Sequence, residues 1–357
     1  MTTTIVIGGG VMGLSAAWEL TRRGERPLVL ERFARGHTHG ASHGETRNFN
    51  NAYGAVHYLD LLQRARRGWD ALGEVDGEPL LRLHGLVTHG GGELSAVHAA
   101  LTARGIAAEL LDGREAARRW PGMRFEDTVL FSPDAGVARA AATLRELERR
   151  ILAAGGEVRW GVPVVGVDDR GDRVAVRTAA ETLIADVAIV TAGAWTRRLL
   201  PGWALPPLTV TEETPAHFAP RIDAPWPSFN HLVDPGRYPA DVYGMPTPGE
   251  GVKVGFHRVG DEVDPDARPH RPTHQVVLAD YVREWMPGLD AGTAVPISCT
   301  YTSTENGDFV LDRRGRVVVG AGFSGHGFKF APGIGGVLAD LAQDADARVA
   351  APFRLPA

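Results

Sequence analysis

Three glycines near the start of the chain have the spacing that brings a backbone against a phosphate. Gly8, Gly10 and Gly13 form the pattern G-x-G-x-x-G in "IVIGGGVMGLSAAWEL". The first permits a tight turn, the second lets the backbone approach a pyrophosphate, and the third lets a helix pack on a strand. Glu31 ends the next predicted strand, where its carboxylate can accept hydrogen bonds from both ribose hydroxyls and would repel a 2′-phosphate. The pattern predicts a dinucleotide site, disfavours NADP and leaves NAD and FAD both open.

A second glycine-rich segment, "GAGFSGHGFKFAPGIGGVLADL", begins at Gly320. A helix expected from near Pro332 points its N-terminal amides toward whatever precedes it, and there it would stabilise the negative charge of a reduced flavin. A plain turn-rich linker, the other interpretation, does not explain why His326 and Lys329 are interleaved with glycines. The glycines that would let the backbone lie close to a flat ring are Gly320, Gly322, Gly325, Gly327, Gly333, Gly335 and Gly336.

The elements that must position these residues alternate between strand and helix at both ends of the chain. The apolar spacing predicts a strand at 4–7, a helix at 11–23 and a strand at 27–30, which form a βαβ unit. The segment 206–301 is rich in proline and short strands. Further predictions are helices at 56–72, 138–154 and 333–345, and strands at 157–160, 173–177, 183–190, 309–311 and 317–319.

This order predicts an α/β fold with a discontinuous Rossmann-like dinucleotide domain and an inserted β-rich (α+β) substrate domain. A length of 357 residues fits two domains. The dinucleotide domain would comprise 1–80, 140–205 and 305–357, and the substrate domain 81–139 and 206–304.

The composition excludes several classes of protein. The net charge of -5 and the lack of a basic cluster exclude a nucleic-acid partner. No run approaches the ~20 apolar residues of a membrane span, and "MTTTIVIGGG" lacks the charged leader of a signal peptide. We therefore expect a cytoplasmic protein without membrane contact. Its one cysteine, Cys299, excludes an internal disulfide and a zinc site built on thiolates, so we expect no metal.

Several motifs together resemble a known family. They are "IVIGGGVMGLSAAWEL", "GASHGETR", "TAGAW", "VKVGFH", "CTYT" and "GFSGHGFKF", which occur in family order and at family-like spacing. The chain resembles the monomeric sarcosine oxidase and N-methyltryptophan oxidase family, FAD-dependent amine oxidases of the D-amino acid oxidase superfamily, over essentially its whole length. The resemblance implies that the dinucleotide is FAD and that the protein is a monomer.

The resemblance also implies a role for Cys299. In that family the cysteine of "CTYT" is bonded to the flavin 8α-methyl group, and Cys299 would form the same thioether. The electron-poor oxidised ring acidifies this methyl group, which can then accept a thiolate, and the bond would raise the reduction potential. The alternative is a small buried hydrophobe, the commonest role of a free cysteine.

Five further residues take roles from the resemblance. His43, Thr46 and Arg47 would lie over one face of the flavin. Lys253 would sit near flavin N5, where a cation stabilises the charge that develops as O2 takes its first electron; its alternative is a solvated lysine on a strand. Lys329 would bind the substrate carboxylate beside the flavin, and its alternative, a surface lysine, is disfavoured by the phenylalanines on either side.

Three aromatic residues complete the implied pocket. His257 and Tyr301 match family pocket residues and could accept or relay the proton of the amine. Each could instead be a packing residue with one satisfied hydrogen bond. For Tyr243 the two interpretations are equal.

The implied reaction is the oxidation of a C–N bond in a neutral secondary amine. A hydride leaves the carbon beside nitrogen for flavin N5, an imine forms, and O2 is reduced to hydrogen peroxide. A flavin dehydrogenase that passes electrons to a partner is an alternative, and Lys253 favours O2. A non-catalytic nucleotide-binding protein is disfavoured because Arg47, Lys253, Cys299 and Lys329 are all present.

The chain departs from the family pattern at two places. Asn50 stands where sarcosine-type members hold the substrate carboxylate with an arginine, and at most one or two neutral hydrogen bonds replace that contact. Asn48 and Asn51 make the same wall polar and uncharged. Glu212 and Glu213 replace an arginine–glutamine pair, and strand alternation predicts that only one points inward. We therefore expect a substrate larger than sarcosine: an N-substituted amino acid, a sugar–amino acid (fructosyl amine) adduct or a cyclic amine of a biosynthetic pathway.

Overall fold

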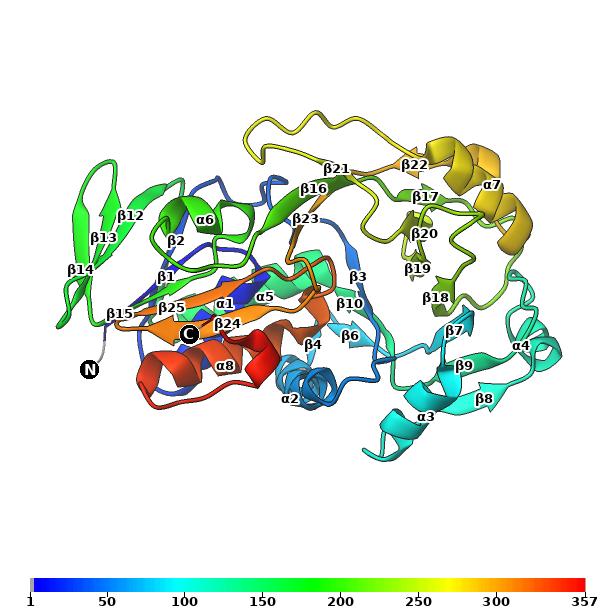
Figure 1. Ribbon diagram of the computed structural model, residues 1–357, viewed down its shortest axis with the longest axis horizontal. Coiled ribbons are helices and arrows are strands. Elements are labelled where there is room, and N and C mark those ends of the chain that lie inside the picture. Colours follow the sequence, from blue (N-terminus) through cyan, green and yellow to red (C-terminus); the bar gives the residue numbers. More distant parts are fainter. Residues whose placement is uncertain (1–2, 357) are drawn as a thin grey trace.

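A six-stranded sheet lies at the centre of one half of the computed structural model, which describes residues 3–356 (Figure 1). The five strands from β11 to β25 are parallel, and β24 pairs antiparallel with β25. β1 and β15 are buried at every position, as expected for strands covered on both faces. The sheet order is β11 (Glu157–Trp160), β2 (Leu28–Glu31), β1 (Thr4–Ile7), β15 (Val187–Val190), β25 (Val317–Ala321) and β24 (Val310–Arg314).

Helices pack against this sheet, and α8 (Ala331–Gln343) and α2 (Val56–Leu72) lie below it in Figure 1. Helix α1 (Val11–Arg22) packs against both α5 (Ala140–Ala153) and α8, and α2 also packs against α8. Their apolar side chains form one buried cluster with the sheet. The glycine turn therefore precedes a helix that is fixed by apolar contacts along its length.

Three glycines of the C-terminal segment serve this helix packing. Gly333, Gly335 and Gly336 lie inside α8. A Cβ on Gly333 would come within 2.9 Å of the Leu61 carbonyl oxygen in α2, and one on Gly335 within 2.5 Å of Ser15 in α1. The predicted contact of these glycines with a flat ring is wrong. They lie where two helices approach so closely that there is no room for a side chain.

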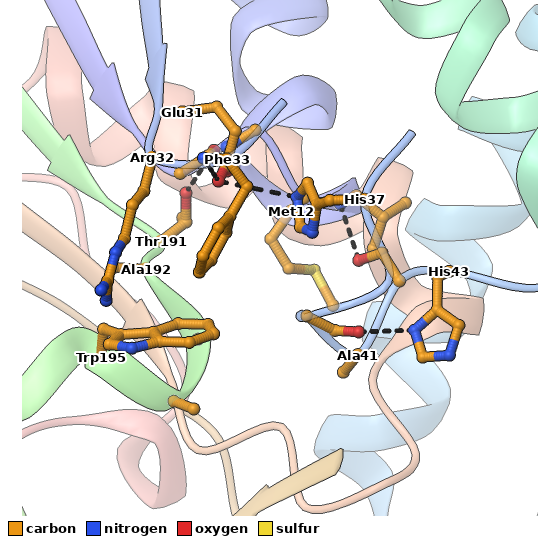
Figure 2. Close-up of a pocket in the computed structure, with 18 of the residues that line it drawn as sticks. Met12, Glu31, Arg32, Phe33, His37, Ala41, His43, Thr191, Ala192 and Trp195 are labelled. Carbon is orange, nitrogen blue, oxygen red and sulfur yellow. Dashed lines mark hydrogen bonds and ion pairs between the residues drawn. The ribbon is translucent and has the colours of Figure 1, made fainter. Parts of the chain in front are cut away.

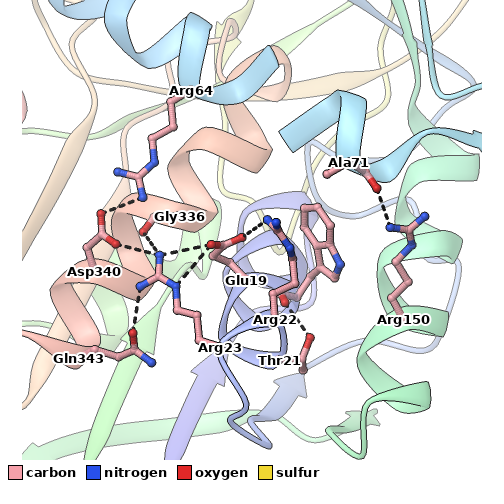
Figure 3. Close-up of polar contacts among 11 residues, drawn as sticks. Glu19, Thr21, Arg22, Arg23, Arg64, Ala71, Arg150, Gly336, Asp340 and Gln343 are labelled. Atoms are coloured by element: carbon pink, nitrogen blue, oxygen red, sulfur yellow. Dashed lines mark hydrogen bonds and ion pairs between the residues drawn. The ribbon is translucent and has the colours of Figure 1, made fainter. Parts of the chain in front are cut away.

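Ion pairs join the exposed surfaces of the same helices (Figure 3). Asp340 of α8 lies 2.8 Å from a guanidinium nitrogen of Arg23 and of Arg64. Arg23 also contacts Glu19 and Gln343. The Asp340 side chain is 41% exposed, so water screens these pairs and each contributes little to stability. The buried apolar contacts hold α8 in place.

An eight-stranded sheet forms the other half of the molecule (Figure 1). Helix α7 (Gln275–Trp285) buries its apolar side against it, and α3 (Leu94–Thr102) and α4 (Gly113–Arg119) lie near β8 and β9. This half has its own apolar core. The sheet order is β22 (Val295–Pro296), β17 (Ala216–Phe218), β20 (Gly251–Phe256), β19 (Val242–Thr247), β18 (Ser228–Leu232), β7 (Leu86–Gly90), β9 (Val129–Ser132) and β8 (Glu109–Leu111).

Two three-stranded sheets lie between the large sheets and carry predicted site residues. β3 and β23 contribute Arg47 and Cys299 respectively. A third small sheet and a two-stranded ribbon lie elsewhere. The orders are β3 (Thr46–Phe49), β10 (Gly136–Arg139), β6 (Leu81–Arg82); β21 (Asp261–Glu262), β16 (Thr209–Glu213), β23 (Cys299–Ser303); β12 (Val164–Asp169), β13 (Val174–Thr178), β14 (Thr182–Ala185); and β4 (Glu74–Val75), β5 (Glu78–Pro79). One further short helix is α6 (Thr196–Leu199).

The predicted α/β class with a Rossmann-like sheet is confirmed, and one predicted strand is wrong. The segment 183–190 is two strands, because β14 pairs with the hairpin strand β13 whereas β15 enters the central sheet. The domain boundaries stay a prediction. Among residues 3–356 we find no helix long and apolar enough to cross a membrane, and no cluster of three or more His, Cys, Asp or Glu side chains suited to a metal ion.

Candidate active site

A cavity of about 1050 Å³ opens at the carboxyl ends of β1, β2 and β15. Gly8 has a φ of 108°, and a Cβ there would lie 2.5 Å from the Thr191 carbonyl oxygen. A Cβ on Gly13 would lie 1.9 Å from the Gly8 carbonyl oxygen. Gly8 and Gly10 line the cavity, while Gly13 lets α1 approach β1. The turn therefore has the close packing predicted for a pyrophosphate cradle.

Glu31 ends β2 and fixes this turn. One carboxylate oxygen accepts the Gly9 N–H at 2.7 Å, and the other accepts the Phe33 N–H at 2.9 Å. The side chain is buried but lines the cavity. A carboxylate has about four acceptor positions, so further positions remain for the predicted ribose hydroxyls.

One wall of this cavity was not predicted from the sequence (Figure 2). The Phe33 and Trp195 rings meet edge to face at 5.2 Å. Asp266 pairs with Arg32 at 2.9 Å and accepts the Trp195 indole N–H at 2.9 Å. Asp266 comes from the long loop after β21, so no local sequence pattern links it to the glycine turn. The two rings therefore give the cavity an aromatic wall.

A second cavity of about 730 Å³ adjoins the first. Residues that line both cavities include Arg47, Cys299, Tyr301, Gly325 and Phe328. The two spaces therefore meet at the predicted catalytic residues. A glycine cradle, a ribose-type carboxylate and a contiguous second chamber fit a dinucleotide whose ring end reaches the junction.

Cys299 lies at this junction beside two predicted cofactor residues. An Arg47 guanidinium nitrogen lies 3.9 Å from the Cys299 Sγ and donates to the Ala41 carbonyl at 2.8 Å. The His43 ring nitrogens lie 2.7 and 3.0 Å from the Gly40 and Ser298 carbonyl oxygens. Burial lowers the pKa of His43. A fixed guanidinium therefore lies next to the half-buried sulfur.

Lys253 is 4% exposed and lines the second cavity. Its ammonium donates to the Thr46 carbonyl at 3.3 Å, and the Thr46 hydroxyl bonds the Thr247 hydroxyl at 2.7 Å. Burial, and next the Arg47 cation, lower the pKa of Lys253 to about 7. The alternative of a solvated lysine is therefore wrong.

Lys329 is 5% exposed, so the alternative of a surface lysine is also wrong. Its ammonium donates to the Tyr53 hydroxyl at 3.0 Å and to the His326 carbonyl at 2.8 Å. The Tyr53 hydroxyl lies 3.2 Å from His326 Nδ1. Among residues 3–356 no carboxylate forms an ion pair with Lys329, and burial lowers its pKa to about 7. A buried cation without a counter-ion on a cavity wall is suited to an anionic group of a ligand.

The tyrosine beside this lysine provides a test of positioning. We expect Tyr53→Phe to weaken binding of a non-oxidisable carboxylate by about 3- to 10-fold at pH 7.5, because the ammonium loses one acceptor. Affinity should recover at lower pH, where Lys329 is protonated again. Calorimetric titration across pH checks this. The matched control is Tyr58→Phe, since the Tyr58 hydroxyl donates to Asp308 instead; equal losses in both variants would contradict the positioning role.

The predicted aromatic residues share the second cavity. The Tyr301 hydroxyl lies 3.4 Å from the Tyr243 hydroxyl, and the His257 ring lies 5.6 Å from the Tyr301 ring. Burial raises the pKa of both tyrosines and lowers that of His257 to about 4. His257 is therefore neutral at pH 7, and its unprotonated ring nitrogen can accept a hydrogen bond. Gly325 (φ 78°) lies against Tyr301, and a Cβ there would come within 2.1 Å of its ring.

Gly322 and Gly327, like Gly325, lie where a side chain would clash with a neighbouring residue. Gly322 has a φ of 64°, and its Cβ would meet Thr304 at 2.7 Å. A Cβ on Gly327 would meet Phe323 at 2.6 Å. Both glycines line the first cavity.

The two departures from the family pattern differ in their location. Asn50 lines the second cavity, and its side-chain oxygen accepts the Ala52 N–H at 2.8 Å. Glu212 and Glu213 are both buried but neither points into the second cavity, so the expectation of one carboxylate facing the pocket is wrong. Glu213 accepts the Val259 and Gly260 N–H groups, and Glu212 lies 3.5 Å from the Arg268 Nε. Neither carboxylate lines the second cavity.

Comparison with known proteins connects this geometry to chemistry. A family model described as FAD-dependent oxidoreductase matches residues 3–341. Monomeric sarcosine oxidase from Bacillus sp. (strain B-0618) is 32% identical, covering 95% of this chain and 91% of that protein. Peroxisomal sarcosine oxidase from Homo sapiens is 34% identical, covering 98% and 95%. The open form of NikD, an unusual amino acid oxidase essential for nikkomycin biosynthesis, superposes with a TM-score of 0.86 at 25% identity over 99% of this chain and 98% of NikD.

Proposed function

Because this chain belongs to the FAD-dependent oxidoreductase family that includes the sarcosine oxidases, we propose that it oxidises a secondary amine bearing a carboxylate in the second cavity. The observation that carries the proposal is the buried Lys329, which pairs with no carboxylate among residues 3–356, on the wall of a chamber that joins the cavity at the glycine turn. When bound, FAD would supply the hydride acceptor and the redox chemistry that reduces O2 to hydrogen peroxide.

The chain's own residues divide the remaining work. Lys329 would hold the substrate carboxylate by a charge-assisted hydrogen bond. Neutral His257 and the paired hydroxyls of Tyr243 and Tyr301 would relay the amine proton. Lys253 would stabilise the negative charge that develops on O2 in a water-poor site.

The cofactor-binding residues would hold FAD at its two ends. The turn at Gly8 and Gly10 and the Glu31 carboxylate would bind the pyrophosphate and ribose. His43, Thr46 and Arg47 would border the flavin ring together with Gly322, Gly325 and Gly327.

A panel of amines tests the proposal. Hydrogen peroxide release should be fastest with N-substituted amino acids larger than sarcosine, assayed beside N-fructosyl and cyclic amino acids. Fast turnover of sarcosine at low KM would contradict the expectation of a larger substrate. Amine oxidation without peroxide would identify a dehydrogenase. A monomeric state and a cytoplasmic location stay predictions.

The covalent bond at Cys299 has a separate test. We expect the yellow chromophore of the wild-type protein to stay with the precipitate after denaturation in acid. Cys299→Ser should release all of it, because a hydroxyl is far less acidic than a thiol and does not add to the ring. Absorbance of the supernatant and of the redissolved precipitate measures the partition. Release of the chromophore from the wild-type protein would contradict the bond while leaving noncovalent FAD binding intact.

A further inference from the structure

We propose that Asn230 and Thr88 form a second recognition subsite of the amine cavity, which takes an uncharged hydroxyl or carboxamide group at the remote end of the substrate. The inference rests on the proposed function and narrows its substrate class. Neither side chain belongs to any motif identified in the sequence.

The strand register brings these side chains into one row with a candidate catalytic residue. Thr88 of β7 pairs with Asn230 of β18, and Asn230 pairs with Tyr243 of β19. Directly paired residues point to the same face of a sheet, and all three line the second cavity. Because neighbouring strands lie about 4.8 Å apart, the row extends the cavity floor about 10 Å from Tyr243 to Thr88.

Asn230 and Thr88 have both hydrogen-bond donors and a hydrogen-bond acceptor that are free for a ligand. The Asn230 amide nitrogen donates to the Thr88 hydroxyl oxygen at 3.3 Å. Within residues 3–356 neither side chain makes another hydrogen bond. The second amide N–H, the amide oxygen and the threonine O–H therefore remain for a ligand. A hydroxyl or carboxamide can use donors and acceptors together.

The surroundings favour a neutral group over an ion. Asn230 is half-buried and Thr88 is 5% exposed, so a charge placed there would lose most of its hydration. Glu93 lines the same cavity but is exposed to water, which screens its charge. The remaining wall at this end is an apolar cluster that includes Ala52, Leu94, Val97 and Leu232.

The size of the chamber agrees with an elongated substrate. At about 730 Å³ it is in the range of pockets that enclose drug-sized ligands. An N-methylated glycine would fill a small part of it. A substrate with its carboxylate on Lys329 and its nitrogen beside Tyr243 would direct a substituent along the apolar wall to Asn230 and Thr88.

N-alkylglycines of matched length that end in methyl, hydroxyl or carboxamide test the subsite. With the wild-type holoenzyme, the hydroxyl or carboxamide end should raise kcat/KM at least about tenfold over methyl, as expected for two neutral hydrogen bonds. Thr88→Val and Asn230→Leu should bring this ratio close to one. Thr88→Ser, which keeps the hydroxyl, should preserve it.

A binding measurement separates failure of the subsite from failure of the proposed function. The corresponding thioethers, which lack the amine, should show the same order of Kd in calorimetric titrations. If no amine of the series is oxidised but the thioethers keep this order, the subsite stands and the amine chemistry is wrong. If methyl-ended compounds react and bind as well as the polar-ended ones, the subsite is overturned.

Discussion

Lys253→Met is expected to slow the reaction with O2 by about 10²–10³-fold, the usual cost of removing one preorganised electrostatic contact. The ammonium is buried, held by the Thr46 carbonyl at 3.3 Å and open to the second cavity. In a site of low polarity, a fixed cation stabilises a developing negative charge far more than water does. Methionine keeps the length of the side chain and removes the charge. Rapid mixing of the reduced enzyme with O2 measures the effect.

The pH dependence of this step has a definite sign. Burial lowers the pKa of Lys253 to about 7, so the side chain is cationic below this value and neutral above it. The rate with O2 should fall as the pH rises through about 7, and the methionine variant should lose this dependence. Lys253→Arg, which keeps a charge, is the control. A methionine variant that reacts with O2 at the wild-type rate would exclude the proposed role.

Lys329→Met is expected to raise KM for carboxylate-bearing amines by about 10- to 100-fold, because a hydrogen bond to a charged group is lost. The Lys329 ammonium donates to the Tyr53 hydroxyl at 3.0 Å, and no carboxylate within residues 3–356 pairs with it. An amine of the same shape without a carboxylate is the matched control ligand, since it gains nothing from the cation. Equal losses for both amines would contradict carboxylate recognition.

The same substitution should stabilise the fold. Burial lowers the pKa of Lys329 from 10.5 to about 7. The unfolded chain therefore binds the proton more strongly than the folded protein does. Burial of the protonated Lys329 lowers the free energy of unfolding; this loss of stability is fully present below pH 7 and disappears above pH 10.5. Lys329→Met removes this loss of stability. About 1 kcal/mol shifts Tm by a few degrees in larger domains, so Tm at neutral pH should rise by about 2 °C or more. The gain should vanish at high pH.

Local patterns in the sequence were sufficient for the dinucleotide half of the site. The glycine turn and Glu31 lie within one βαβ unit, where the spacing along the chain fixes the geometry. The buried run of β1 and the helices α1, α2, α5 and α8 were predicted within three residues of their observed ends, whereas α3, α4 and α7 were not predicted. Such features depend on near neighbours in the chain.

The substrate half depends on contacts between distant segments. Tyr53 reaches Lys329 across 276 positions, and Asn230 reaches Thr88 across 142. The strand register that aligns Thr88, Asn230 and Tyr243 is set by the eight-stranded sheet as a whole, and no local pattern encodes it. For Glu212 and Glu213, alternation could not show whether either carboxylate reaches the cavity, and both are buried away from it. Gly333, Gly335 and Gly336 were assigned to ring binding, although they let α8 pack closely on its neighbours. The sequence does not separate these two roles, because both require a residue without a side chain.

The most direct test is to load the purified protein with FAD, remove O2 and add an N-substituted amino acid. The account predicts that the visible flavin absorbance bleaches with one equivalent of amine and returns when O2 is admitted, with an equal amount of hydrogen peroxide. A protein that takes up no FAD, or one that binds FAD but is bleached by no secondary amine of the panel, would contradict it.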